Sequence, residues 1–155
     1  MSERTLSEPI ATLMPHARTM CWLQTLVEAS DEHLVAEAVA GLDHPFAAPD
    51  GIAIWHGLEY MAQAVAAWAG WRARQRGEPP KIGFLLGTRR YEFSRPALPL
   101  GETLRIHVQR EFFADNGLGM FRCEIRVGDA SVAHAALSVF EPPNADDFLK
   151  GHVSP

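Results

Sequence analysis

The 155-residue sequence has few of the features that define several large classes of protein. It contains two cysteines, Cys21 and Cys123, which lie far apart and show no metal-ligand spacing. We therefore expect two reduced core thiols rather than a disulfide framework or a cysteine-held metal. No apolar run approaches the length needed to cross a bilayer, and the first residues lack the pattern of a signal peptide. These absences favour a cytoplasmic protein without a membrane span.

The sequence also lacks an excess of positive charge. Its 14 Lys and Arg residues stand against 19 Asp and Glu residues, for a net charge of −5 and a pI of about 5.8. Nonspecific binding of nucleic acid requires a basic surface, so we do not expect nucleic acid as a partner. An acidic protein partner would be repelled by the molecule as a whole and would need a local basic patch.

The motifs of several enzyme classes are missing as well. There is no Gly-x-Ser-x-Gly nucleophile elbow and no Gly-Lys-Ser/Thr phosphate loop, and Gly117 and Gly119 lack the third glycine of a dinucleotide fingerprint. No cluster of His, Cys or carboxylate residues has metal-ligand spacing, so we expect neither a cofactor nor a metal. Residues 10–141 contain no repeat or linker, which predicts one domain over residues 1–155 with peripheral ends.

One long helix is predicted over residues 54–75. Apolar residues recur on it at helical spacing, and Glu59 is the only formally charged side chain between Ile54 and Trp71. A helix that is apolar around most of its circumference is expected to be buried. A buried carboxylate is costly unless it is paired or held neutral, so Glu59 is either a structural oddity or a catalytic acid.

Strands are predicted on both sides of this helix, where hydrophobic alternation is bounded by turn residues. The segment 33–40 is rich in Ala and Glu and could also form a helix on propensity alone. Because no helix separates the later strands, they must be antiparallel. We therefore expect an α+β hotdog fold, with a sheet of five to six strands wrapped around one long central helix, although other α+β packings stay open. The strands are expected at 20–28, 33–40, 103–109, 120–127 and 132–140.

Four short motifs, in order along residues 13–141, resemble those of the 3-hydroxyacyl-acyl carrier protein dehydratases of the hotdog superfamily. The third is Glu59-Tyr60-Met61-Ala62-Gln63, and the segment Gly57-Leu58-Glu59-Tyr60-Met61-Ala62-Gln63 is most similar to a subgroup found with aryl polyene biosynthesis genes. The chain also departs from the family, because Pro and Phe are swapped after His44 and Pro49-Asp50-Gly51 replaces the usual Pro-Gly pair. The other three motifs are Leu13-Met14-Pro15-His16, His44-Pro45-Phe46 and Phe93-Ser94-Arg95-Pro96-Ala97-Leu98-Pro99-Leu100-Gly101-Glu102-Thr103-Leu104.

The resemblance implies a lyase that converts a 3-hydroxyacyl thioester, carried by acyl carrier protein, to the trans-2-enoyl thioester in fatty acid or aryl polyene biosynthesis. It implies that His44 is the base at C2, that Glu59 is the acid for the leaving hydroxyl, and that Gln63 orients Glu59. In such enzymes the two catalytic residues come from different subunits, so a homodimer or a higher assembly of dimers is expected. A backbone N–H at or just after Gly51 is expected to hold the thioester carbonyl, with Trp55 as a further substrate contact.

Simpler interpretations of the same residues stay open. His44 beside a proline is typical of a turn, and His56 is a rival base. Gln63 could only satisfy a buried backbone group. Three further sets each have two interpretations. Arg18 or Arg90 could neutralise Glu59. The tryptophans Trp55, Trp68 and Trp71 are more typical of a core than of a substrate tunnel. Two sets of basic residues form either a solvated face or a patch for the carrier protein: Arg89, Arg90 and Arg95, and Arg72, Arg74, Arg76 and Lys81.

Two other functions are compatible with the same fold, because fold alone does not fix function. A hotdog acyl thioesterase would use Glu59 to activate water and would have little need of His44. A non-catalytic subunit would pair with an active dehydratase and stabilise it. Isomerisation of the product double bond is less expected, because the bifunctional relatives usually carry Asp where this chain has Glu59.

Overall fold

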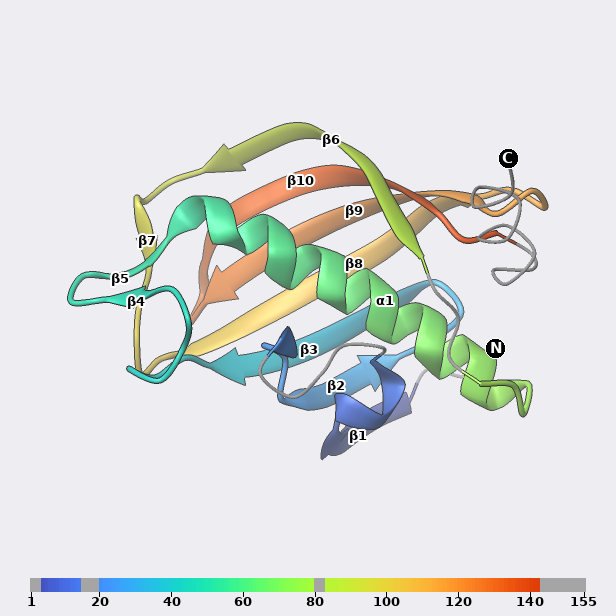
Figure 1. Ribbon diagram of the computed structural model, residues 1–155, viewed down its shortest axis with the longest axis horizontal. Coiled ribbons are helices and arrows are strands. Elements are labelled where there is room, and N and C mark those ends of the chain that lie inside the picture. The colour runs from blue at the N-terminus through green and yellow to red at the C-terminus, as the bar shows by residue number, and fades with distance from the viewer. Residues whose placement is uncertain (1–3, 15–19, 80–82, 143–155) are drawn as a thin grey trace, which may run out of the picture.

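A computed structural model describes residues 4–14, 20–79 and 83–142 of the chain. Its main sheet has seven strands in the order β1-β2-β3-β8-β9-β10-β6, each antiparallel to its neighbours. The sheet curves around the long helix α1 (Gly57–Gln75), which lies across its inner face (Figure 1). The predicted hotdog fold is therefore confirmed. The strands are β1 (Arg4–Pro9), β2 (Thr25–Ala29), β3 (His33–Val39), β6 (Phe84–Phe93), β8 (Thr103–Phe113), β9 (Leu118–Val127) and β10 (Ala130–Phe140).

The sheet is wider than the five to six strands expected from the sequence. The first ten residues were expected to be peripheral, but β1 extends the sheet by pairing with β2. The residue that follows it, Ile10, is fully buried, and its N–H donates to the carbonyl of Gln24. Main-chain pairing and this buried side chain hold residues 4–10 against the sheet. The short polar stretch gave no hydrophobic alternation from which a strand could be predicted.

Helix α1 follows a 3-10 turn, η3 (Ile54–His56), so the predicted helix 54–75 is confirmed with a tighter first turn. At its other end Glu78 N–H donates to the carbonyl of Ala73 and Gly77 N–H to that of Arg74. With a φ of 71° at Gly77, this is a Schellman ending, which glycine adopts at least cost. Within the helix, a Cβ at Gly70 would lie 2.1 Å from the carbonyl oxygen of Leu13, so only glycine allows this close approach of the chain.

The core lies between α1 and the sheet. Trp68 and Trp71 are buried, which confirms them as core residues, and side chains along β8 and β9 alternate between buried and exposed as their period-two pattern predicts. Cys123 is buried in this core and Cys21 is half-buried; both are free, as expected. Burial raises the pKa of both thiols, so both stay protonated at neutral pH.

A small second sheet lies beside the N-terminal end of α1 (Figure 1). It consists of β4 (Ala47–Ala48), β5 (Gly51–Ala53) and β7 (Ala97–Leu98). A bulge in β6 helps to fix the same end of the helix, because one residue of β10 faces both Arg90 and Tyr91, and Arg90 has a φ of 53°. The bulge turns Tyr91 inward, where its hydroxyl donates to the carbonyl of Ile54. The start of α1 is thus held by both sheets.

The part of the chain that the structure describes has no helix long and apolar enough to cross a membrane. Several residues named in the sequence analysis fall outside that part. They are Pro15 and His16 of the first motif, Arg18 as a possible partner of Glu59, and Lys81 of the possible basic patch.

Candidate functional site

Glu59 and Gln63 lie one turn apart on α1 and are hydrogen-bonded to each other. Gln63 Nε2 donates to Glu59 Oε2 over 2.9 Å and to the carbonyl of Met20 over 2.6 Å, while Gln63 Oε1 accepts the backbone N–H of Trp22 over 2.8 Å. Gln63 is 1% exposed. It therefore does what both interpretations of the sequence suggested: it satisfies buried backbone groups and contacts Glu59. Whether it orients Glu59 for catalysis stays a prediction.

Glu59 faces an apolar groove of about 270 Å³ that runs between α1 and the sheet. The groove follows one face of the helix, along Ala62, Ala66 and Ala69, whose small side chains leave the space open. The opposite wall comes from Phe84 and Leu85 of β6 and from Phe121 and Val139 of the sheet. A carboxyl group at one end of a hydrocarbon-lined groove is an arrangement suited to an acyl chain whose polar end is placed beside Glu59.

His44 lies in the turn between β3 and β4. Its N–H donates to the carbonyl of Gly41 and its carbonyl accepts the N–H of Ala47, each over 3.0 Å, so the backbone on both sides is fixed. Its ring Nδ1 accepts the backbone N–H of Phe46 over 3.1 Å. The ring therefore points its Nε2 away from the turn and toward the protein interior.

Four aromatic rings gather around His44, and we call the five residues Trp22, His44, Phe46, His56 and Tyr60 the aromatic cluster. The ring of Trp22 lies 4.4 Å from that of His44, measured between centroids, and that of Tyr60 lies 6.1 Å away and nearly parallel. Phe46 and His56 stack on each other at 4.1 Å. The cluster borders a cavity of about 300 Å³ lined by Trp22, His44 and Tyr60.

The aromatic cluster holds three buried polar atoms that have no hydrogen-bond partner among the described residues. They are Trp22 Nε1, His44 Nε2 and the Tyr60 hydroxyl. Buried polar atoms are nearly always satisfied in native proteins, because an unmade bond costs about 1–3 kcal/mol. Three together point to a site that is completed by something beyond the described residues, such as another part of the chain, a ligand, ordered water or a second subunit.

The surroundings of His44 favour a neutral imidazole. Burial lowers its pKa, the charge of nearby His56 lowers it further, and Asp43 opposes both effects. A neutral ring whose Nδ1 accepts a hydrogen bond carries its proton on Nε2. Tyr60 beside it is also neutral, because burial raises its pKa to about 12.

His44 and Glu59 line different cavities in the single chain. They are linked through Trp22, whose ring lies against that of His44 and whose backbone N–H donates to Gln63, and through Tyr60, which follows Glu59 in the chain and whose ring lies near that of His44. The structure thus does not bring the two predicted catalytic residues together around one cavity within the single chain.

The other predicted site residues are spread more widely. Gly51 is buried in β5, ahead of η3, so its N–H belongs to the small sheet rather than to the first turn of α1. Trp55 is 66% exposed in the single chain, unlike Trp68 and Trp71. Arg89 and Arg90 are exposed on β6 and Arg95 is partly buried in the turn after it. Their roles as carbonyl, substrate and carrier-protein contacts stay predictions.

Sequence reasoning missed Trp22 and Tyr60. Tyr60 is within the third motif, next to Glu59, and that position could have drawn attention to it. Trp22 carries no such signal, because it reaches the site only through the fold. No group of three or more His, Cys, Asp or Glu residues that could hold a metal occurs among residues 4–14, 20–79 and 83–142.

Comparison with known proteins bears on this site. A family model described as ApeP-like, ApeP dehydratase, matches residues 8–150. The chain is also similar to a solved structure described as the dehydratase heterocomplex ApeI:P from Xenorhabdus doucetiae, with 28% identity and a TM-score of 0.85. That match covers 97% of this chain and 100% of the other. The resemblance inferred from the four motifs is therefore confirmed.

More distant structures share the fold alone. Cj0977, a sigma28-regulated virulence protein from Campylobacter jejuni, is 16% identical with a TM-score of 0.61, over 87% of this chain and 96% of that one. A hypothetical thioesterase with coenzyme A from Streptococcus pneumoniae is 11% identical with a TM-score of 0.58, over 75% and 83%. No curated protein matches the sequence.

Proposed function

The chain belongs to the ApeP-like dehydratase family, and from that premise we propose that it removes water from a 3-hydroxyacyl thioester carried by acyl carrier protein. The product would be the trans-2-enoyl thioester, formed during growth of a fatty or aryl polyene chain. The observation that carries this proposal is the apolar groove, which ends at the only carboxyl group of the first four turns of α1. Exposed arginines on β6, Arg89 and Arg90, offer a basic patch for the acidic carrier protein.

In the proposed reaction His44 takes the proton from C2 as the base. The C3–O bond breaks, and Glu59 gives its proton to the departing hydroxyl, which leaves as water. The lowered pKa of His44 supports the base role, because the imidazole is then neutral near pH 7. Gln63 holds Glu59 in place through its hydrogen bond.

One observation favours a second assignment of roles. The Phe46 N–H occupies Nδ1 of His44, so the proton of the neutral ring sits on Nε2, the buried nitrogen that has no partner among the described residues. A base needs a free lone pair there, so the first assignment requires this contact to break. In the second assignment the Glu59 carboxylate takes the C2 proton and passes it to the leaving hydroxyl, while His44 Nε2–H donates to the thioester carbonyl.

We propose that the site is completed across a contact between two subunits. His44 and Glu59 line different cavities in one chain, and apolar side chains near His44 are exposed, with Leu42 at 83% and Trp55 at 66%. The edge strand β6 exposes Leu85, Leu86 and Phe93. An exposed apolar edge of this kind invites a partner strand.

A second copy of the chain is the partner proposed first. A second candidate is a different dehydratase chain, because the similar structure from Xenorhabdus doucetiae is described as a heterocomplex. In that case this chain could be the non-catalytic member. The unpaired polar atoms of the aromatic cluster fit either partner equally well.

The function is tested with the purified chain and a 3-hydroxyacyl thioester of a carrier protein. We expect loss of water, followed as formation of the enoyl product by mass spectrometry, from a preparation that light scattering shows to be dimeric or larger. Release of free acid and thiol instead would identify a thioesterase. Turnover that appears only after a second dehydratase chain is added would assign the non-catalytic role.

A further inference from the structure

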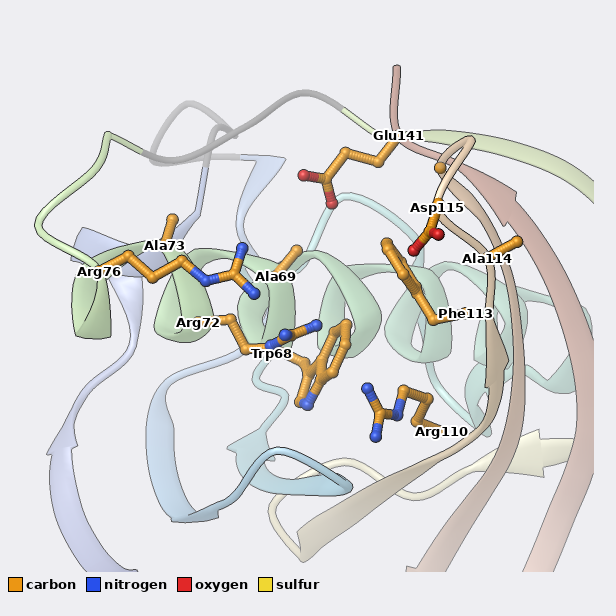
Figure 2. A pocket seen from close by; sticks show the side chains of 11 residues that line it. Trp68, Ala69, Arg72, Ala73, Arg76, Arg110, Phe113, Ala114, Asp115 and Glu141 are labelled. Carbon is orange, nitrogen blue, oxygen red and sulfur yellow. The ribbon is translucent and has the colours of Figure 1, made fainter. Parts of the chain in front are cut away.

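The apolar groove has a neighbouring cavity at the end away from Glu59. This second cavity has a volume of about 430 Å³ and shares Trp68, Ala69, Phe113 and Glu141 with the groove as lining residues. The second cavity lies over the last turns of α1, beside the end of β8 (Figure 2). The groove and the second cavity thus follow one another along α1, over roughly 20 Å from Glu59 to Arg72 at 1.5 Å per residue.

Three arginines surround this second cavity, and we call it the arginine pocket. Arg72 comes from α1, Arg76 is the residue that caps the C-terminal end of that helix and Arg110 comes from β8; their guanidinium groups point toward the space around Trp68 (Figure 2). The guanidinium carbon of Arg72 lies 5.0 Å from the centre of the Trp68 ring and that of Arg110 lies 6.0 Å away. Stacking on the indole fixes these planar groups and leaves their N–H edges able to bind a ligand.

The positive charge of the pocket is only partly compensated. Arg110 pairs with Glu32 at 2.5 Å, but Arg72 is 3.9 Å from Asp31, beyond hydrogen-bond length, and Arg76 has no ion-pair partner among the described residues. Asp115 and Glu141 on the rim offset part of the charge. Burial lowers the pKa of Arg72, and the charges of Arg76 and Arg110 lower it further, with Asp31 and Glu141 opposing them.

The groove between this pocket and Glu59 limits what the ligand can be. Its side chains are apolar apart from the two glutamates at its ends, so a chain with internal amides would lose hydrogen bonds there, whereas a hydrocarbon would not. The guanidinium forks at the far end bind oxyanions with matching geometry. The occupant with the best fit is therefore a hydrocarbon chain with an oxygen-bearing anionic group at its far end.

We propose that the arginine pocket binds an anionic oxygen group, such as a carboxylate, at the distal end of the substrate's acyl chain. This proposal rests on the proposed function, because it takes Glu59 to mark the thioester end of the chain. The pocket would then select substrates by the group that they carry far from the reacting carbons, and by the length that brings that group to Arg72 and Arg76.

Binding of inert probes tests this proposal separately from turnover. The probes are two saturated acyl N-acetylcysteamine thioesters of equal length, one ending in a carboxylate and one in a methyl group, both without the 3-hydroxyl. Titration calorimetry of the full-length protein should show the carboxylate probe binding at least about tenfold tighter, a difference of about 1.4 kcal/mol. Binding is measurable even if the chain proves not to dehydrate anything.

Matched variants locate the binding. Arg76→Gln should remove most of the advantage of the carboxylate probe and leave the methyl probe unchanged. Arg74→Gln is the control, because Arg74 lies in the same helical turn but pairs with Glu8 at 2.8 Å and does not line the pocket. Ala66→Leu should weaken both long probes by filling the groove, without changing weak binding of acetate.

Four results would overturn the proposal. These are equal affinity for the two probes, an equal loss in the Arg74 and Arg76 variants, and full affinity of the long probes for Ala66→Leu. The fourth is an Arg76-dependent preference for phosphopantetheine over pantetheine without any preference between the two acyl probes, which would assign the pocket to the carrier arm instead.

Discussion

The two halves of the candidate site differ in how complete they are within one chain. On the Glu59 side, Gln63 is hydrogen-bonded to the Glu59 carboxyl, to the Met20 carbonyl and to the Trp22 N–H, and the groove is already open. On the His44 side, three buried polar atoms have no partner among the described residues. The Glu59 half is thus complete among the described residues, whereas the histidine half depends on what covers the aromatic cluster.

This difference follows from where the residues lie. Glu59 and Gln63 are one turn apart on a buried helix, so local geometry brings them together. His44 and Trp22 come from turns outside the main sheet and meet only because the chain folds back. The polar atoms of side chains that meet in this way are available to a partner or a substrate when no neighbouring group along the chain bonds to them.

The largest expected effect is on catalysis. His44→Ala and Glu59→Gln should each lower the rate of dehydration by at least about 100-fold, since acid–base residues contribute about 10²–10⁴-fold. The rate is measured as enoyl thioester formed per subunit, with light scattering to show that the assembly is intact. Full activity of His44→Ala would refute the assignment of the site.

His44→Gln separates the two assignments of roles. Glutamine can donate a hydrogen bond but cannot act as a base, so this variant should be as inactive as His44→Ala if His44 is the base. Partial activity of His44→Gln above that of His44→Ala would favour the second assignment, in which Nε2–H only donates.

The next largest effect is on stability. Gln63→Leu leaves the Met20 carbonyl and the Trp22 N–H without partners, at about 1–3 kcal/mol for each group, so the free energy of unfolding should fall by about 2–6 kcal/mol. Urea unfolding measures the loss. Gln24→Leu is the control: Gln24 also makes two backbone bonds, to Val39, but it is exposed and should lose less than about 1 kcal/mol. Equal losses of unfolding free energy would mean that the burial of Gln63 adds nothing to the cost of losing its hydrogen bonds.

The comparison also explains what the sequence could predict. The long helix, the strands with period two and the Glu59–Gln63 spacing are local patterns, and each is found where expected. Strand β1 was missed because its pairing with β2 depends on main-chain contacts rather than on its polar sequence. Residues 20–24 were expected in a strand, but Trp22 gives its N–H to Gln63 instead of to the sheet.

The parts of the site that depend on the path of the chain could not be predicted. No pattern in the sequence places Trp22 against His44, or Arg110 beside Arg72 over one tryptophan. Gly51 was expected at the helix start from a family motif, yet an additional strand and a 3-10 turn intervene. Short-range spacing predicted the Glu59 half of the site, and only the fold revealed the rest.

The pH dependence of stability tests the environment of His44. In the unfolded chain His44 takes up a proton near pH 6.5, whereas burial delays this in the folded protein. Between these two pKa values the unfolded state binds more protons than the folded state. The contribution of His44 to stability is therefore full above pH 6.5 and is lost as the pH falls through the lower pKa of the folded protein. Urea unfolding over this range should show a shallower fall for His44→Gln. His107→Gln is the matched control and should show the same change, since burial also lowers the pKa of His107. If the slope changes in His107→Gln but not in His44→Gln, His44 is not buried in the way that lowers its pKa.

The smallest expected effect separates two tyrosines whose hydroxyl groups differ in hydrogen bonding. Burial raises the pKa of Tyr60 and of Tyr91 to about 12, but the Tyr91 hydroxyl donates to the carbonyl of Ile54 while the Tyr60 hydroxyl has no partner among the described residues. Tyr91→Phe should therefore cost about 1 kcal/mol of unfolding free energy, and Tyr60→Phe should cost nothing or stabilise slightly. Both are measured by urea unfolding of the assembled protein. If Tyr60→Phe proves as costly as Tyr91→Phe, the hydroxyl is bonded in the assembly, and the His44 half of the site is then as complete as the Glu59 half once its partner is in place.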